Sequence, residues 1–367
     1  LLGVLQSLDL RRVAGWRRAA GGALTRHGGE ALTYGYMAGP GPLISWLCEG
    51  IAQREGRNLQ PDALLITAGN SQALDQLLTL CTRPGDTLLV ESPTYHLGVR
   101  ILRDHPVNLV AVPADEQGLE SEALAHILAD LRRRNIRPPL LYTVPTFHNP
   151  MGVSLSLARR QALVALAAEY ELLVVEDDVY RELAYDGPSL PSLWSLAPHQ
   201  VIRMGSFAKS LAPGVRLGWL TGPRTAIGRL ANGGLLDSGG GINHFSALIV
   251  NEFCQSGEYD AHVAALRAAY TKRRDSLLAA LATHLPGCRW YWPAGGFFAW
   301  VLLPEPLRSS SLLPYAEAAG VSFLPGSRFY LNGGGENALR LAFSLYPPAR
   351  LEEGVARLGS ALAAYQS

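Results

Sequence analysis

Lysine is nearly absent from this chain. Of the 32 basic residues, only Lys209 and Lys272 are lysine, and the other 30 are arginine. Lys272 lies in a charged stretch with helical spacing, where a solvated surface charge is expected, whereas Lys209 lies between small and apolar residues. Arginine cannot lose its proton or form an imine, but a desolvated lysine can do both. The use of lysine at position 209 therefore indicates a chemical role.

Cysteine, excess charge and long apolar runs are also scarce. The four cysteines are scattered and form no C-x-x-C pair, so we expect buried free thiols in a reducing cytoplasm. A net charge of +1 gives no global attraction to nucleic acid or to an anionic membrane. No apolar run approaches the ~18 residues of a membrane span. A signal peptide is not expected, because arginines interrupt the apolar stretches near the start, at Arg11, Arg12, Arg17 and Arg18.

Short β-rich runs alternate with helical stretches between residues 60 and 225. The expected strands are 64–67, 87–91, 140–144, 172–176, 201–204 and 216–221, and the clearest helices are 71–82 and 157–170. This alternation predicts βαβ units and an α/β fold with a doubly wound, mostly parallel sheet.

The pattern changes beyond about residue 245. A long helix over 259–283, strands over 296–303 and 338–343, and a closing helix over 351–365 predict a smaller α+β domain. We therefore divide the chain into an N-terminal segment 1–40, a large domain 41–245 and a small C-terminal domain 246–367. Residues 233–241 are expected to be a glycine-rich loop.

Three polar residues stand at the ends of predicted strands. Asn149 follows the strand 140–144, Asp177 ends the strand 172–176, and Lys209 follows the strand 201–204. Ligands of open α/β sheets bind beyond the carboxyl ends of the strands. We therefore expect these three side chains to meet at one edge of the sheet.

The motifs occur in a characteristic order: Asn149-Pro150, Asp177-x-x-Tyr180, Ser206-x-x-Lys209 and Arg216. In this order the chain resembles the aspartate-aminotransferase-like family of pyridoxal-phosphate enzymes (fold type I, class I/II), from about Tyr34 to the last helix. The segments 148–152, 175–180 and 205–210 look most like the 2-aminoadipate and aromatic aminotransferase branch.

This resemblance implies pyridoxal 5'-phosphate as cofactor and a role for each motif. Lys209 would hold the cofactor as a Schiff base and move a proton during the reaction. Asp177 would keep the pyridine nitrogen protonated, so that the ring acts as an electron sink. Asp178 competes for this role on sequence alone, and the Tyr three residues on favours Asp177. Tyr180 and Asn149 would hydrogen-bond the phenolic oxygen of the cofactor.

The cofactor phosphate needs hydrogen-bond donors and positive charge. The strand–glycine–helix segment around residue 70 would offer its helix N-terminus; from the local sequence alone, an N-cap is the better interpretation of Ser71. By resemblance the phosphate ligands are Asn70, Ser71, Gln72, Ser206 and Arg216, and Tyr95 stacks on the pyridine ring. Asn70 departs from the family, in which a small Ser is usual at this position.

Two further residues extend the resemblance. Tyr34 would reach the phosphate of a neighbouring subunit, which implies a homodimer with shared sites. Arg340 lies in an apolar strand and needs an anionic partner. By resemblance Arg340 clamps the substrate α-carboxylate, which would restrict substrates to α-amino and 2-oxo acids; a structural salt bridge is the alternative. Arg328 has two possible roles, a solvated surface charge or a partner for an acidic substrate side chain. Asn243 and His244 could each contact the substrate or have a structural role.

The expected function is transamination, in which an α-amino acid gives its amino group to the cofactor and a 2-oxo acid then takes it, in two ping-pong half-reactions. One alternative is the ligand-sensing domain of a MocR-type transcriptional regulator. Another is a different pyridoxal-phosphate reaction, such as a lyase, a decarboxylase or an oxidative deaminase. Asn149-Pro150 and Asp178-Val179-Tyr180 favour the enzymes over the regulators.

Overall fold

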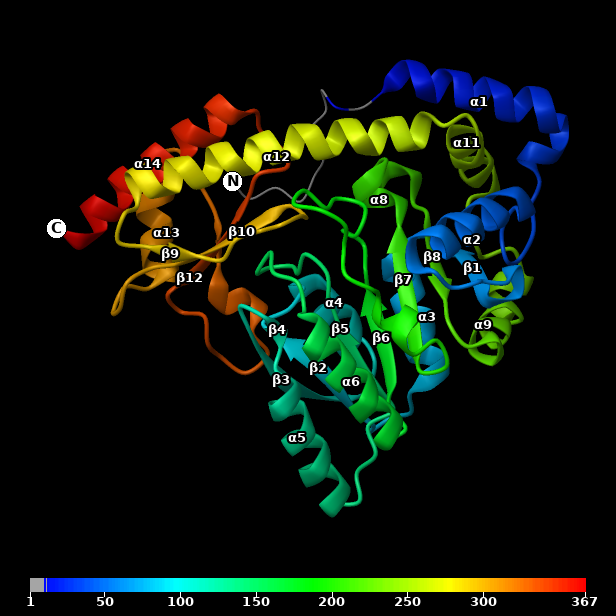
Figure 1. Cartoon of the computed structure of the whole chain (residues 1–367), viewed down its shortest axis with the longest axis horizontal. Coiled ribbons are helices and arrows are strands. Elements are labelled where there is room, and N and C mark those ends of the chain that lie inside the picture. The colour runs from blue at the N-terminus through cyan, green and yellow to red at the C-terminus, as the bar shows by residue number, and fades with distance from the viewer. Residues whose placement is uncertain (1–9, 11) are drawn as a thin grey trace.

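An eight-stranded mixed sheet organises the larger part of the molecule (Figure 1). The computed structural model describes residue 10 and residues 12–367; residues 1–9 and 11, part of the predicted N-terminal segment, lie outside the described residues. The strand order is β1-β8-β7-β6-β5-β2-β3-β4. The strands are β1 Leu64–Thr67, β2 Thr87–Ser92, β3 Asn108–Asp115, β4 Gly118–Leu119, β5 Leu140–Thr143, β6 Leu173–Asp177, β7 Val201–Ser206 and β8 Gly218–Thr221.

The centre of this sheet is parallel and its edges are antiparallel. Strands β3, β2, β5, β6 and β7 run in one direction, whereas β8 pairs antiparallel with both β7 and β1. A parallel neighbour needs a crossover of a dozen or more residues. The link from β7 to β8 holds only the short helix α8 (Phe207–Ser210) and one 3-10 turn (Pro213–Val215), so the chain turns back on itself there.

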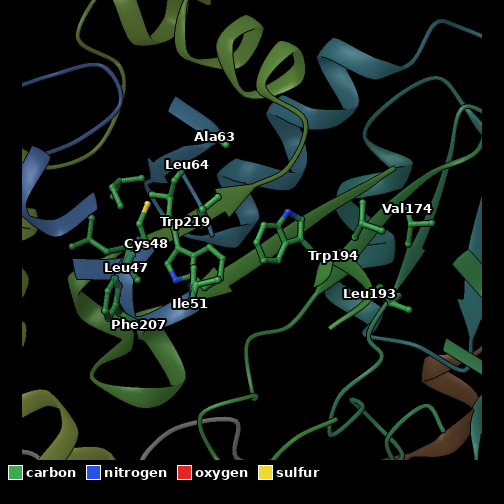
Figure 2. Packing of buried hydrophobic residues seen from close by; sticks show 14 of the residues in the cluster. Leu47, Cys48, Ile51, Ala63, Leu64, Val174, Leu193, Trp194, Phe207 and Trp219 are labelled. Carbon is green, nitrogen blue, oxygen red and sulfur yellow. The ribbon is translucent and has the colours of Figure 1, made fainter. Parts of the chain in front are cut away.

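Helices cover both faces of the sheet. Side chains alternate along each strand: Leu64 and Ile66 pack into one hydrophobic cluster, and Leu65 between them packs into another. The first cluster also holds residues of α2 (Gly41–Glu55), α5 (Ser121–Arg133) and α6 (Leu157–Glu169), and the second holds residues of α3 (Asn70–Cys81), α4 (His96–Arg103) and α9 (Arg224–Ala231). Figure 2 shows Leu47 and Ile51 of α2 beside Trp219 of β8.

The C-terminal part forms a second, antiparallel sheet of order β11-β12-β10-β9. Its strands are β9 Arg289–Trp290, β10 Phe298–Leu302, β11 Leu324–Pro325 and β12 Ala338–Ala342, with helices α13 Ser309–Ala318 and α14 Pro348–Gln366. The long helix α12 (Glu258–His284) joins the two parts (Figure 1). Val263 of α12 packs in the core of the large sheet, and Leu266, three residues later, packs in that of the small sheet. The domain boundary at 245 stays a prediction.

The remaining helices lie beside the large sheet. Helix α1 (Val13–His27) packs on α11 (His244–Gln255), where the rings of Trp16 and Phe253 are in contact. The short helix α7 consists of Leu193–Leu196. The prediction of a loop over 233–241 is wrong in part, because Gly234–Asp237 form the short helix α10, which buries Leu236 in the core of the large sheet. Within the described part of the chain, no helix is long and apolar enough to cross a membrane.

Candidate active site

A cavity of about 150 Å³ lies at the carboxyl edge of the parallel strands. Asp177, the last residue of β6, and Lys209, on α8 just after β7, both line it, and Asn149 enters from the segment after β5. The structure thus brings together the three residues expected at this edge. Nine of the predicted site residues lie on its wall: Asn70, Ser71, Tyr95, Asn149, Asp177, Tyr180, Ser206, Lys209 and Arg216.

Asp177 accepts two hydrogen bonds inside this cavity. Nδ2 of Asn70 lies 3.1 Å from Oδ1 of Asp177, and the hydroxyl of Tyr142 lies 2.7 Å from Oδ2. Burial raises the pKa of Asp177 to about 6, while the two hydrogen bonds act in the opposite direction. The carboxylate is therefore held at a pKa that leaves it mostly ionised at neutral pH.

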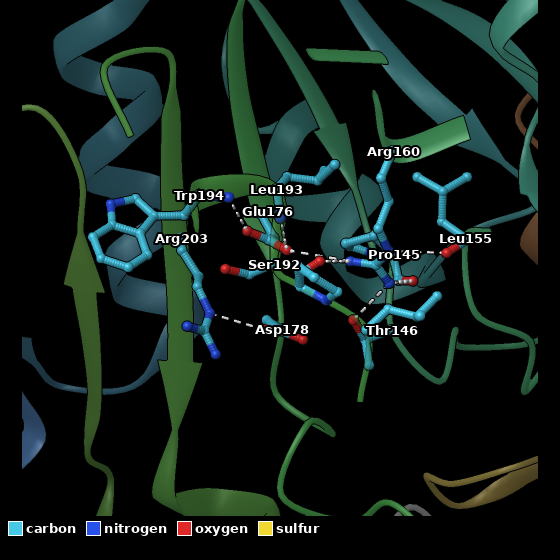
Figure 3. A network of polar contacts seen from close by, with 12 residues as sticks. Pro145, Thr146, Leu155, Arg160, Glu176, Asp178, Ser192, Leu193, Trp194 and Arg203 are labelled. Carbon is cyan, nitrogen blue, oxygen red and sulfur yellow. Dashed lines mark hydrogen bonds and ion pairs between the residues drawn. The ribbon is translucent and has the colours of Figure 1, made fainter. Parts of the chain in front are cut away.

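The neighbouring Asp178 is committed to a different group of charges. Its Oδ2 accepts from Nε of Arg203 at 2.8 Å and lies 3.6 Å from Nη1 of Arg181; Figure 3 shows the contact with Arg203. Both arginines also pair with Glu55, at 3.0 and 2.9 Å. Successive side chains of a strand point to opposite faces, and Asp177, which the Tyr three residues on already favoured, is the one of the two that lines the cavity.

Lys209 is almost completely desolvated. Burial lowers the pKa of Lys209 to about 8, Arg340 and Arg216 act in the same direction, and Asp177 acts against it. Its Nζ lies 5.9 Å from the centre of the Tyr180 ring. A pKa near 8 makes the neutral, nucleophilic amine accessible at neutral pH, which an ordinary lysine does not offer.

The N-terminus of α3 and Arg216 form a cradle for an anion. Gly69 caps the helix with a φ of +91°, and a Cβ at this position would lie 2.8 Å from Nη2 of Arg216. The positive φ favours glycine at this position, and a Cβ would also force the Arg216 guanidinium to shift. Ser206 joins this wall and caps α8, its Oγ accepting from the backbone N–H of Ala208 at 3.0 Å. Free helix N–H groups and a fixed cation suit a phosphate.

Two predicted phosphate ligands lie elsewhere in the described chain. The Gln72 side chain turns back along α3, where its Oε1 accepts from the N–H of Ala68 at 2.8 Å. Tyr34 is 85% exposed and lies beside Gly239, next to a different hollow of the surface. Neither residue lines the cavity within a single chain.

Arg340 of β12 brings the small sheet to the edge of the cavity. Its Nη1 donates to Oδ1 of Asn149 at 2.8 Å. The guanidinium lies over two rings, 4.1 Å from the centre of Phe298 and 5.0 Å from that of Phe329. Burial lowers the pKa of Arg340 to about 10, which still leaves it charged at neutral pH. Asn149 also hydrogen-bonds Tyr180, so that one amide connects the two predicted subsites.

Two buried charged side chains anchor the segment that leads to Asn149. The carboxylate of Glu91 accepts from the Thr143 hydroxyl at 2.7 Å and lies 3.4 Å from Nε2 of His148. Between these two residues, Arg160 donates to the carbonyl of Pro145 at 2.6 Å and to the Thr146 hydroxyl at 3.1 Å (Figure 3). These contacts fix the backbone from which Asn149 reaches Arg340.

Three positions that the sequence left open have ordinary surroundings in a single chain. Asn243 caps α11, its Oδ1 accepting from the N–H of Ser246 at 2.8 Å. His244 makes an edge contact with the ring of Tyr36. Arg328 is exposed in the turn after β11.

Tyr142 is the site residue that the sequence did not reveal. It lies in the apolar strand Leu140–Thr143, where a tyrosine reads as a core aromatic. The available signal was chemical: a phenol in a strand buried on both faces needs a hydrogen-bond partner.

Known proteins resemble this chain in sequence and in fold. A model of the family described as "Aminotransferase class I and II" matches residues 12–358. The chain belongs to this family. Its doubly wound fold with a smaller second sheet is that of fold type I, as the resemblance implied, and its solved neighbours share it.

Two relatives illustrate the similarity. The aromatic-amino-acid aminotransferase 1 of Thermococcus litoralis is 33% identical over 344 residues, covering 92% of this chain and 82% of that protein. The alpha-aminoadipate aminotransferase LysN of Thermus thermophilus, solved in complex with N-(5'-phosphopyridoxyl)-L-leucine, is 33% identical with a TM-score of 0.90, covering 100% of this chain and 92% of that one.

A regulator is also similar to this chain. The uncharacterized HTH-type transcriptional regulator YdfD of Bacillus subtilis is 32% identical over 306 residues, covering 83% of this chain and 62% of that protein. The family match and the aminotransferase relatives nevertheless support the enzyme: this aminotransferase moves an amino group from an amino acid to a 2-oxo acid.

Its cofactor is pyridoxal 5'-phosphate, and the residues present fit it. The cavity joins a desolvated lysine, a buried carboxylate and an anion cradle closed by Gly69 and Arg216. The anion cradle suits the phosphate of the cofactor, the carboxylate suits its pyridine nitrogen, and the lysine suits its aldehyde carbon.

Proposed function

We propose that Lys209 and Asp177, which line the same cavity, carry the transamination. Bound pyridoxal phosphate supplies an aldehyde carbon that accepts amino groups and a ring that takes up electron density. The amine of Lys209 would hold the cofactor covalently and, in its free form, would take a proton from the substrate α-carbon and return one. Asp177 holds a proton at the pyridine nitrogen. The observation that carries this proposal is the placement of a desolvated lysine and a buried carboxylate in one cavity.

Arg340 selects the substrate in this proposal. Its planar guanidinium is matched to a carboxylate and is fixed by Asn149 and by the rings of Phe298 and Phe329. It therefore favours α-amino and 2-oxo acids over plain amines. Asn149 and Tyr180 orient the phenolic oxygen of the cofactor, and the Tyr95 ring stacks on the pyridine.

The phosphate is assigned to the cradle at the N-terminus of α3. Asn70, Ser71 and Gln72 start this helix, Arg216 lies beside its cap Gly69, and Ser206 lines the same cavity. Gln72 contributes through its backbone, because its side chain is turned toward Ala68.

We also propose a homodimer in which Tyr34 completes the partner's cradle. Tyr34 belongs to a group of exposed apolar residues that is well suited to pack against a second copy: Leu32, Tyr34, Tyr36, Met37 and Leu235. Mixing a Tyr34→Ala variant with a Lys209→Ala variant is expected to restore activity, since hybrid dimers hold one intact site. A mixture no more active than its parents would contradict shared sites.

The cytoplasmic location stays a prediction.

The test of transamination follows the cofactor spectrum. Purified holoenzyme is mixed with a panel of amino acids and its visible absorbance is recorded. A spectral change that occurs without release of ammonia or carbon dioxide, and that 2-oxoglutarate reverses, is expected. Release of either gas without a reversible change would instead indicate a lyase, a deaminase or a decarboxylase.

A further inference from the structure

Tyr142 stands against the carboxylate that serves the pyridine nitrogen. It is fully buried on β5 and its hydroxyl is 2.7 Å from Oδ2 of Asp177. Asn70, at the start of α3, reaches Oδ1 with its amide at 3.1 Å. Each carboxylate oxygen therefore has its own donor, and the two donors come from separate elements. Hydrogen bonds donated to a carboxylate favour its ionised form.

We propose that Tyr142 is a positioning residue that, together with Asn70, keeps Asp177 ionised and directed into the cavity. The proposal rests on the assignment of Asp177 to the pyridine nitrogen. Burial alone raises the pKa of Asp177 and favours its neutral form, which would leave the nitrogen without a counter-charge. The two donors oppose that effect.

Gly98 supports the role of the Tyr142 hydroxyl. It lies in the interior of α4, where glycine destabilises a helix relative to alanine. A Cβ at this position would lie 3.1 Å from the hydroxyl oxygen of Tyr142 and 3.0 Å from Cδ1 of Tyr95. Glycine at position 98 thus leaves the space in which the phenol stands beside Asp177 and behind the predicted stacking ring.

Other charged or titratable groups also act on this carboxylate. Lys209 lowers the pKa of Asp177 and Asp178 raises it. Tyr95 and Tyr180 face the same cavity, and both have pKa values that Asp177 helps to raise. These groups are unchanged in the variants below, so a shift between variant and wild type reports the missing donor.

The test measures the affinity of apoenzyme for pyridoxal 5'-phosphate as a function of pH, by fluorescence titration. Tyr142→Phe keeps the ring and removes the donor. Because a hydrogen bond to a charged group is worth roughly a factor of 10 to 100, the acid limb of the affinity profile is expected to move up by about one to two pH units. Affinity at pH 7 then falls about two- to tenfold and recovers at alkaline pH. Asn70→Ala should move the limb in the same direction.

Tyr185→Phe is the matched control. Its hydroxyl donates to the carbonyl of Gly296, remote from Asp177 in the hydrogen-bond network, and its loss should leave the profile in place. If Tyr142→Phe does not fold, Gly98→Ala still tests the proposal, because the added methyl crowds the hydroxyl and should shift the limb the same way.

Two results would overturn the proposal: a Tyr142→Phe profile that overlays the wild type, or one that is lowered equally at every pH, as a purely structural role would produce. Asp177→Asn, measured in parallel, separates this failure from that of the proposed function. Weak binding by Asp177→Asn at every pH, with Tyr142→Phe unchanged, rejects only the role of Tyr142. Wild-type binding by Asp177→Asn rejects the assignment of Asp177 and the role of Tyr142 with it.

Discussion

Replacing Arg340 by methionine isolates the contribution of the guanidinium to substrate selection. Methionine is long enough to stay between the rings of Phe298 and Phe329, which now lie 4.1 and 5.0 Å from the guanidinium carbon, and sulfur packs well on aromatic rings. Packing is thus largely retained, while the charge and the bidentate donors are lost. Two hydrogen bonds to a charged group contribute about 1.5–3 kcal/mol each.

A loss of about 3–6 kcal/mol corresponds to a fall of about 10²- to 10⁴-fold in kcat/KM. The assay compares an L-amino acid that has a neutral side chain with the primary amine that lacks its carboxylate. The variant should lose this factor on the amino acid only, so that the preference for the carboxylate disappears. Arg328→Met, at an exposed position, is the control and should leave kcat/KM for the amino acid within about twofold.

Equal losses on the amino acid and on the amine would refute the assignment of Arg340. Such a result would mean that the arginine supports the fold or the cofactor rather than the substrate carboxylate. Melting temperature and cofactor absorbance, measured on both variants, show whether a loss of structure accounts for the change.

Three further outcomes are expected. The rate at which apoenzyme binds pyridoxal 5'-phosphate covalently should rise with pH and level off above about pH 8, because only neutral Lys209 reacts and burial lowers its pKa to about 8. Stopped-flow absorbance measures this rate, and a rate independent of pH would contradict the prediction. Gly69→Ala should weaken cofactor affinity about tenfold or more, because a φ of +91° is strained for alanine and the added Cβ contacts Arg216. Gly228→Ala is the control: this position lies in open space on α9, and the change should have no effect in the same titration. Arg160→Met should lower the free energy of unfolding by about 3 kcal/mol in urea, because it leaves the carbonyl of Pro145 buried without this donor and removes one of two arginines that favour the buried charge of Glu176, the other being Arg203; an unchanged midpoint would argue against this anchor.

Sequence patterns predicted the strands that form the centre of the large sheet. Strands such as β5 and β7 are buried on both faces and read as short apolar runs, so their positions follow from the sequence alone. The reversed direction of β8 did not follow, because it depends on how the chain turns after Lys209. The short helix at Gly234–Asp237 was also missed, since one buried Leu236 decides it within a run of glycines.

Some residues of the functional site could likewise be predicted from the sequence, and others could not. Residues with unusual chemistry for their setting, such as Lys209 in an arginine-rich chain and Arg340 in an apolar strand, were found from the sequence. The sequence favoured Asp177 over Asp178 only through the Tyr three residues on, and the structure adds that Asp177 lines the cavity whereas Asp178 pairs with Arg203. Asn70, a departure from the family pattern, is explained by its bond to Asp177.

The identity of the lysine that binds the cofactor tests the central claim most directly. Borohydride reduction of the holoenzyme fixes the cofactor to the amine that holds it, and peptide mass spectrometry then locates it. The chain offers only two side chains for this, Lys209 and Lys272, so Lys272→Ala is a matched control. The account predicts label on Lys209 alone, retained in Lys272→Ala and lost in Lys209→Ala. Label on Lys272, or label that survives in Lys209→Ala, would contradict it.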